Sequence, residues 1–194
     1  AASFPLLPIM AYGFLAILPK IAVTYVVGLG IEFIAAQWRK EEIQEGFLVT
    51  GILVPLICPI ETPLWMLAVA TAFSVIFVKE VFGGTGYNIF NVALVTRAFL
   101  FFAYPASMSG DRAFISASPI CGIGGTVNFA DGISGATPLG QIATHSGGAL
   151  QIHNIVGDPV SNWDAFLGLI PGSFGETSTL CILIGAALLL TTGI

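Results

Sequence analysis

The sequence predicts an all-α integral membrane protein with multiple transmembrane helices, some of them broken or half-length, and a long extracytoplasmic loop. Hydrophobic residues make up 56% of the 194 positions, and charged residues make up only 9%. Soluble domains average about 45–50% apolar and about 25% charged residues. The chain also contains 23 Gly and 11 Pro, which membrane helices tolerate and broken helices use. We expect residues 1–194 to form a single membrane domain.

Composition and residue spacing argue against several functions. The net charge is −5 and the six Lys and Arg are scattered, so no nucleic-acid partner is expected. The cysteines, Cys58, Cys121 and Cys181, lie too far apart for a zinc or iron–sulfur site, and we expect them to be small buried residues. His145 and His153 lie eight residues apart without other metal-ligand residues in a recognisable spacing, so no metal site is expected there. Because the chain starts without Met and stops within an apolar run, we expect a fragment of a longer protein.

Residues 10–36 predict the first spanning helix, because this apolar run exceeds the roughly 20 residues needed to cross hydrocarbon. Pro19 lies inside the run and predicts a kink. Glu32 also lies inside it, and an ionisable group in hydrocarbon is costly enough to make it a functional candidate. The alternative is that Glu32 lies in the interface, close to residues 38–42. That segment combines Trp with two cations and predicts a cytoplasmic boundary.

Three further helices are predicted before residue 105. Residues 47–58 form an apolar run of about a dozen residues, which suits a half helix better than a full span. Residues 62–81 predict a second span, and Lys79 near its end predicts a return to the cytoplasmic side. Residues 92–104 predict a helix with Arg97 in its middle. An Arg in that position needs a carboxylate, a phosphate or the membrane interface.

A glycine-rich loop, residues 83–86, precedes this helix. It lacks the Lys-Ser/Thr of a phosphate-binding loop, so its glycines are better explained by close approach of a flat ligand or another helix. Asn88 and Asn91 follow at a spacing that predicts one shared helix face, where paired amides can bind donor and acceptor edges together. The alternative for Asn88 is that it caps the helix N-terminus.

Residues 105–162 are polar and rich in Gly and Ser, and a loop of this length is usually functional or disordered. Alternation of the preceding helices makes it extracytoplasmic. Residues 163–169 then predict an interfacial helix, and residues 180–190 a final apolar run. Glu45 and Glu176 precede similarly spaced apolar residues, which predicts an inverted repeat of broken helices. The ordinary explanation is that an acidic residue suits a helix N-terminus.

Within this loop, the stretch 131–137 presents a hydroxyl behind small residues. Its glycines permit a tight turn, Pro138 stiffens the exit, and the side chain of Thr137 is left uncrowded. An ordinary surface turn is the alternative. With Pro138 and Leu139 following, the stretch resembles the site at which a flavin transferase attaches FMN to threonine through a phosphoester bond. That resemblance makes Thr137 the attachment point, within a motif that also contains Asp131, Ser134, Gly135 and Ala136.

Residues 82–91, 97–105 and 108–111 are similar to the NqrB/RnfD family. This family includes the NqrB subunit of the sodium-translocating NADH:quinone oxidoreductase and the RnfD subunit of the Rnf ferredoxin:NAD oxidoreductase. The resemblance covers about residues 28–190, and the runs 97–105 and 108–111 favour the first of the two subunits. One residue departs from the pattern: Val92 stands where the family usually has Pro. This departure affects the expected start of the local helix rather than the expected ligand.

The resemblance implies a multi-pass subunit of a sodium-pumping complex in the bacterial inner membrane. Electrons would arrive from an NADH-oxidising subunit and pass through FMN on Thr137 and a non-covalent riboflavin near Asn88 and Asn91. They would then reduce ubiquinone, coupled to sodium export. The resemblance also implies a quinone region at Gly28, flavin transferase as a maturation partner, and contact with other membrane subunits and lipid. No acid–base catalytic residue is expected.

Glu32 is the sodium candidate, because a hard cation prefers oxygen ligands; weaker candidates are Glu45, Glu80 and Asp111. Two alternative functions remain. One is a subunit of the Rnf type. The other is a flavin-free secondary transporter with inverted repeats, which would explain the broken helices and Glu32 but would leave the stretch 131–137 as coincidence.

Overall fold

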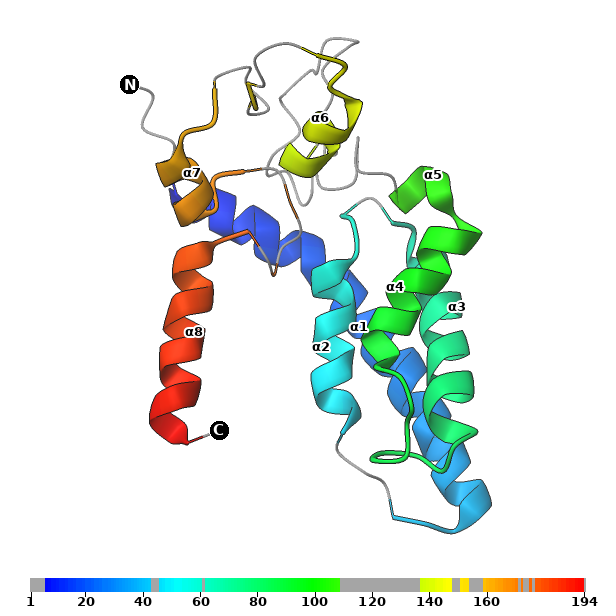
Figure 1. Cartoon of the computed structure of the whole chain (residues 1–194). Coiled ribbons are helices and arrows are strands. Elements are labelled where there is room, and N and C mark those ends of the chain that lie inside the picture. The colour runs from blue at the N-terminus through cyan, green and yellow to red at the C-terminus, as the bar shows by residue number, and fades with distance from the viewer. Residues whose placement is uncertain are drawn as a thin grey trace.

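The computed structural model describes residues 6–42, 46–60, 62–108, 137–147, 151–153, 159–170, 172, 175 and 177–193 (Figure 1). Within these ranges the secondary structure is helical, apart from one isolated β-bridge between His153 and Pro159. The elements are α1 (Leu6–Arg39), α2 (Phe47–Ile57), α3 (Leu64–Ser74), the π-helix η1 (Val75–Glu80), α4 (Val92–Ala103), α5 (Pro105–Met108), α6 (Pro138–Thr144), α7 (Asn162–Leu167) and α8 (Thr179–Thr192). The all-α prediction is confirmed for this part of the chain.

The predicted helices are present, but their lengths differ from expectation. Of the described helices, one contains a segment, Gly13–Arg39, that is long and apolar enough to cross a membrane by length and composition. This segment lies in α1, which continues through Pro19. The half-length of α2 is confirmed at 11 residues. The expected second span consists of α3 followed directly by η1, and the sequence did not predict this change to a π-helix.

Helices α1 to α4 pack into a bundle, and α1 and α3 run in the same direction. At one end, the ammonium group of Lys20 donates a hydrogen bond to the carbonyl of Pro59, just before α3. At the other end, Arg39 at the end of α1 pairs with Glu80 at the end of η1. The two helices therefore end at the same end of the bundle, and the assignment of that end to the cytoplasmic side stays a prediction.

Aromatic rings and glycines interlock α1 and α2. The Phe47 ring lies against Gly28, and the Tyr25 ring lies against Gly51. The Tyr25 hydroxyl donates a hydrogen bond to the Leu48 carbonyl at 2.6 Å, and the two rings meet edge to face with centroids 6.5 Å apart. Each glycine lets a ring of the opposite helix approach its backbone, which explains why so short a helix as α2 packs closely on α1.

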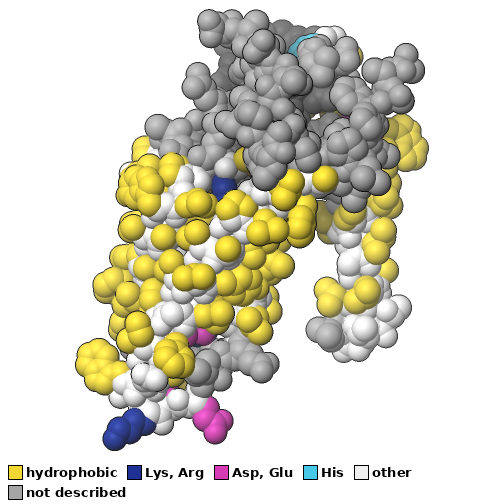
Figure 2. Space-filling model, turned by 180° about the vertical axis from the view of Figure 1, so that it is seen from behind, with side chains coloured by type: hydrophobic (Ala, Val, Ile, Leu, Met, Phe, Trp, Pro, Cys, Tyr) yellow, Lys and Arg dark blue, Asp and Glu magenta, His cyan; other side chains and the backbone are white. Residues whose placement is uncertain are grey.

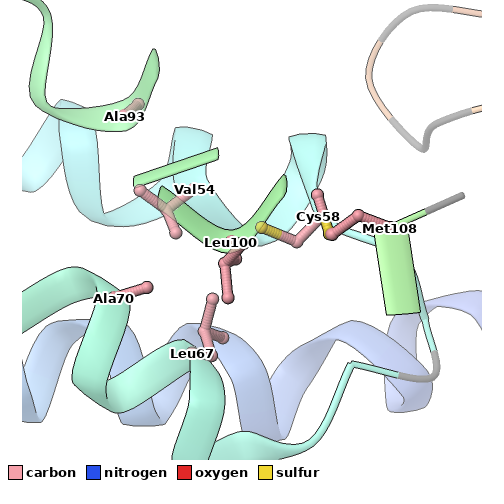
Figure 3. Packing of buried hydrophobic residues seen from close by; sticks show 7 residues of the cluster. All are labelled: Val54, Cys58, Leu67, Ala70, Ala93, Leu100 and Met108. Carbon is pink, nitrogen blue, oxygen red and sulfur yellow. The ribbon is translucent and has the colours of Figure 1, made fainter. Parts of the chain in front are cut away.

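Two hydrophobic clusters form the core of the bundle. The larger consists of Val54, Cys58, Leu67, Ala70, Ala93, Leu100 and Met108 (Figure 3). The other consists of Phe47, Val75, Val78 and Val92. The prediction that Cys58 is buried is confirmed. For Cys181 it is wrong, because this residue is exposed on α8; Cys121 lies outside the described residues.

Outside the bundle, α8 packs mainly on α7 and is exposed along its length. A reciprocal capping box starts α7: the Ser161 backbone N–H donates to the Asp164 carboxylate at 3.0 Å, and Ser161 Oγ accepts from the Asp164 N–H at 3.2 Å. Hydrogen bonds from the backbone and side chain of Ser161 lower the pKa of Asp164. Gly168 has a φ of 89° and lies directly against Ser178, where any side chain would collide.

Candidate functional site

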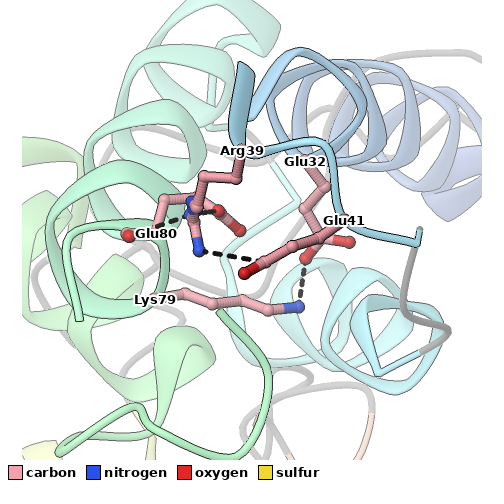
Figure 4. A network of polar contacts seen from close by, with 5 residues as sticks. All are labelled: Glu32, Arg39, Glu41, Lys79 and Glu80. Carbon is pink, nitrogen blue, oxygen red and sulfur yellow. Dashed lines mark hydrogen bonds and ion pairs between the residues drawn. The ribbon is translucent and has the colours of Figure 1, made fainter. Parts of the chain in front are cut away.

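Two charged residues, Glu32 of α1 and Lys79 of η1, form an ion pair inside the bundle (Figure 4). Each is only 5% exposed, and the Lys79 ammonium group donates a hydrogen bond to the Glu32 carboxylate. Glu32 is therefore buried inside the bundle, where a lysine balances its charge, and its depth in the membrane stays a prediction. The Lys79 ammonium group also lies 5.8 Å from the centre of the buried Phe47 ring, so α1, α2 and η1 meet at this pair.

A second pair lies at the end of the same two helices. Arg39 pairs with the Glu80 carboxylate, donates to the Glu80 carbonyl at 2.9 Å and lies 3.8 Å from the Glu41 carboxylate. A pocket at this end is lined by Glu32, Ala36, Arg39, Glu41, Glu42, Lys79, Glu80, Gly83, Gly84 and Thr85. Carboxylates outnumber cations in this lining, so the lining has a net negative formal charge. Figure 2 shows acidic and basic side chains at one end of a mostly hydrophobic face, with Lys or Arg atoms also visible near the other end.

The weaker sodium candidates have different outcomes. Glu80 belongs to this pocket, whereas Glu45 and Asp111 lie outside the described residues. Glu176 also lies outside them, so the proposed inverted repeat stays a prediction. In the part of the chain that the structure describes, no group of three or more His, Cys, Asp or Glu side chains could hold a metal ion.

Gly28, the predicted quinone residue, is buried against α2. A Cβ atom there would lie 1.9 Å from Cζ of Phe47. One turn later, an apolar groove begins on α1 and η1, lined by Ile31, Ile34, Ala35, Trp38, Arg39, Ile76, Glu80 and Val81. Gly28 therefore has a packing role that the sequence did not reveal.

Replacing Gly28 with Ala is expected to destabilise the protein by about 1–3 kcal/mol, because the new methyl group overlaps the Phe47 ring in a packed interface. Gly30→Ala is the matched control, since nothing lies within 4 Å of a Cβ atom at that position. Thermal unfolding in detergent measures both effects. Adding Phe47→Leu to Gly28→Ala should recover part of the loss. Equal unfolding temperatures for the two glycine variants would contradict the packing role.

Asn88 and Asn91 both precede α4, so the prediction that they share a face of that helix is wrong. Asn91 is the N-cap: its side-chain oxygen accepts hydrogen bonds from the N–H groups of Ala93 at 2.9 Å and Leu94 at 3.2 Å. The Asn88 amide donates instead to the Phe90 carbonyl at 3.0 Å. The capping role considered for Asn88 therefore belongs to Asn91, because α4 begins one residue after it. Both side chains are exposed.

Arg97 has a partner that the sequence did not predict. Its guanidinium group donates to the Ile57 carbonyl at 2.8 Å, while Lys20 donates to the Pro59 carbonyl. The last carbonyls of a helix lack intrahelical partners. Two cations from neighbouring helices thus bind carbonyl groups at the carboxyl end of α2, and Arg97 uses a carbonyl group in place of a carboxylate or phosphate.

Thr137 is the N-cap of α6, and its side-chain oxygen accepts a hydrogen bond from the Gly140 N–H at 3.2 Å. The side chain is partly exposed, and Pro138 occupies the first helical position. The other motif residues, Asp131, Ser134, Gly135 and Ala136, lie outside the described residues. Helices α5 and α6 also show that residues 105–162 contain short helices within the predicted loop.

Sequence reasoning missed a residue that holds α6 in place. The Gln141 side chain donates to the His153 carbonyl at 2.7 Å and accepts from the His153 N–H at 2.8 Å. Its backbone N–H donates to the Thr137 carbonyl at 2.9 Å. Only its position one turn after Thr137 marked it in the sequence.

The two predicted flavin regions lie at opposite ends of the bundle. The α6 helix, which Thr137 starts, lies at one end, and the loop from η1 to α4, with Asn88 and Asn91, lies at the other (Figure 1). The 12 residues of α4 alone span about 18 Å at 1.5 Å per residue.

A sequence model described as the NQR2, RnfD, RnfE family matches residues 2–194. The chain is 50% identical, over 184 residues, to the B subunit of the Na(+)-translocating NADH-quinone reductase of Klebsiella pneumoniae (strain 342), covering 95% of this chain and 41% of that protein. The corresponding B subunit of Yersinia pestis is 48% identical, covering 93% and 40%, and that of Neisseria meningitidis serogroup A is 47% identical, covering 92% and 40%. This chain therefore spans about two fifths of the length of these relatives.

Proposed function

This chain belongs to the NQR2, RnfD, RnfE family, and we propose that it is the central membrane part of the B subunit of a sodium-translocating NADH:ubiquinone oxidoreductase. The observation that carries the proposal is the match over nearly the whole chain to relatives with that name. The same names favour this function over a subunit of the Rnf type. A flavin-free transporter has no comparable support. Family and names imply a bacterial membrane protein within a multi-subunit complex.

For the covalent flavin, the residues described fit the chemistry. Thr137 is partly exposed and has its oxygen at the start of a helix, held by one N–H group, so a phosphate can approach it from solvent. In the proposal, flavin transferase joins FMN to Thr137 through a phosphoester, and the motif residues Asp131, Ser134, Gly135 and Ala136 are part of the recognised sequence. A bound flavin accepts and donates electrons, and Gln141 holds the helix that presents it.

For the non-covalent riboflavin, Asn88 and Asn91 offer amide groups at the opposite end of the bundle. Asn91 uses its oxygen to cap α4, so its NH₂ group is the part directed to a ligand. The proposed order is FMN on the extracytoplasmic side, riboflavin at the cytoplasmic end, and then ubiquinone. We assign the quinone region to the cytoplasmic half of α1 after Gly28, where the apolar groove offers a surface for an isoprenoid quinone.

Glu32 remains the sodium candidate in this proposal. Its carboxylate lines a pocket with excess negative charge. It is also buried, and the attraction between a dehydrated cation and a carboxylate is strongest away from water. Because Lys79 already balances this charge, sodium binding here requires the ammonium group to move away. Partner subunits that oxidise NADH are required, since the proposal gives this chain no NADH site.

Substituting both asparagines tests the riboflavin step and the proposed function together. In the complete complex, Asn88→Ala with Asn91→Asp should lower extractable riboflavin severalfold while keeping α4 capped, because Asp is as good an N-cap as Asn and lacks the NH₂ group. Flavin extraction followed by chromatography measures the content. Asn91→Asp alone, which keeps the cap and lacks only the NH₂ group, separates the contribution of Asn91 from that of Asn88. Unchanged riboflavin in the double variant would contradict the assigned role.

A further inference from the structure

Four hydroxyl side chains lie inside the α1–α4 bundle with 0% of their surface exposed. We call them the hydroxyl layer: Thr24 of α1, Thr71 and Ser74 of α3, and Thr96 of α4. In α3 the layer lies between Ala70 and Val75, which belong to the two separate hydrophobic clusters. Along α3, a polar layer thus separates the two hydrophobic clusters.

The packing of the helices brings these residues to similar levels along the bundle. Thr24 precedes Glu32 by eight residues, and Thr71 precedes Lys79 by eight. Because α1 and α3 run in the same direction and the Glu32–Lys79 pair joins them, Thr24 lies about 12 Å before the pair along α1, and Thr71 lies before it by the same number of residues along α3 and η1. On the antiparallel α4, Phe99 stacks on Phe73 with ring centroids 4.7 Å apart. Thr96 is one turn from Phe99, so it lies within about a turn of Ser74.

The hydrogen bonds of the layer leave oxygen atoms available. Thr24 donates its hydroxyl proton to the Lys20 carbonyl and Thr96 to the Val92 carbonyl, each at 2.8 Å, so their oxygens keep acceptor capacity. Within the described ranges, Thr71 Oγ1 and Ser74 Oγ have no hydrogen-bond partner. Buried polar groups in native proteins are almost always paired with protein, water or an ion. Thr62 Oγ1 and Thr85 Oγ1 are also unpaired, but Thr71 and Ser74 lie one turn apart in the bundle interior, so their two hydroxyls can accept a shared water molecule or ion.

The backbone at this level adds further oxygen atoms. The N–H group of Val75 is shared between the carbonyls of Thr71 and Ala72, at the residue where α3 becomes the π-helix η1. One donor divided between two carbonyls leaves each with acceptor capacity. Single π-helical turns inside helices occur frequently at functional sites.

We propose that the hydroxyl layer is a transit site for a partly dehydrated sodium ion. Hydroxyl and carbonyl oxygens are the ligands that a hard cation prefers. The layer has no carboxylate, so it binds a cation weakly enough to release it, as conduction requires. The carboxylate-rich pocket at the Glu32 end of α1 lies along the same two helices and supplies the cation. The inference rests on the proposed function and extends it to residues outside the Glu32–Lys79 pair.

The test uses the complete complex in proteoliposomes and measures NADH-driven uptake of radioactive sodium against sodium concentration. Thr71→Val with Ser74→Ala should raise the sodium concentration for half-maximal uptake about tenfold or more. Each substitution removes one hydroxyl oxygen that contacts the sodium ion. It should also change the preference for sodium over lithium. Thr71→Ser, which keeps the hydroxyl, should stay within about threefold of the unsubstituted complex. Thr50→Val, in α2 and outside the layer, is the matched control.

The outcomes separate the inference from the proposed function. The double variant Thr71→Val with Ser74→Ala could leave the sodium titration and the lithium preference unaltered and raise the unfolding temperature. The layer would then hold only water or unpaired hydroxyls. This result would overturn the inference but not the proposed function. Failure of the unsubstituted complex to take up sodium would overturn the proposed function and the inference with it.

Discussion

Replacing Thr137 with Ala is expected to abolish covalently bound flavin. The proposed phosphoester forms on the threonine oxygen, and alanine has no atom that can replace it. The loss should be complete rather than partial, because no change in affinity is involved. Flavin fluorescence of the denatured protein in a gel, from a host that expresses a flavin transferase, measures the label. Mass analysis of the peptide that contains residue 137 then locates it.

The substitution also removes the N-cap of α6, which costs about 0.5–2 kcal/mol at an ordinary helix. Thr137→Asn separates the two effects, since asparagine caps well but offers no hydroxyl. We expect Thr137→Asn to lose the covalent flavin and to keep α6. Label retained in Thr137→Ala would show that the flavin is attached elsewhere and would return the stretch 131–137 to an ordinary turn.

Replacing Lys79 with Met is expected to destabilise the protein by about 3–5 kcal/mol. The change leaves the Glu32 carboxylate buried without its partner, and an uncompensated buried charge is far more costly than a missing pair. Adding Glu32→Gln should restore most of the stability, because it removes the orphaned charge. Lys40→Met is the matched control: it makes the same change of side chain at an exposed position. Thermal unfolding in detergent measures all of these variants.

The same variant tests Glu32 as the sodium candidate. In Lys79→Met, sodium chloride should stabilise the protein more than choline chloride does, because a cation that binds the free carboxylate favours the folded state by mass action. The sodium effect should disappear when Glu32→Gln is added. Equal effects of the two salts on Lys79→Met would remove Glu32 from the proposed sodium path.

The sequence by itself determined the elements whose signals are local. The long apolar run predicted α1, the dozen apolar residues before Pro59 predicted the half-length of α2, and Lys79 near the end of the apolar run 62–81 predicted where η1 ends. Each signal is carried by neighbouring residues, because the length and polarity of a helix depend on residues adjacent in the chain. The proposed flavin attachment motif and the family resemblance also rest on residues that are adjacent in the chain.

Only the tertiary structure decided which residues meet. Lys79, the partner of Glu32, lies 47 residues away, and the carbonyl that Arg97 binds lies 40 residues away. No periodicity within one helix encodes such contacts, since they arise from the register between packed helices. Asn91 rather than Asn88 became the cap because α4 begins one residue after it. The hydroxyl layer has the same origin: each hydroxyl is ordinary in its own helix, and together they form a layer because the Glu32–Lys79 pair aligns α1 with α3.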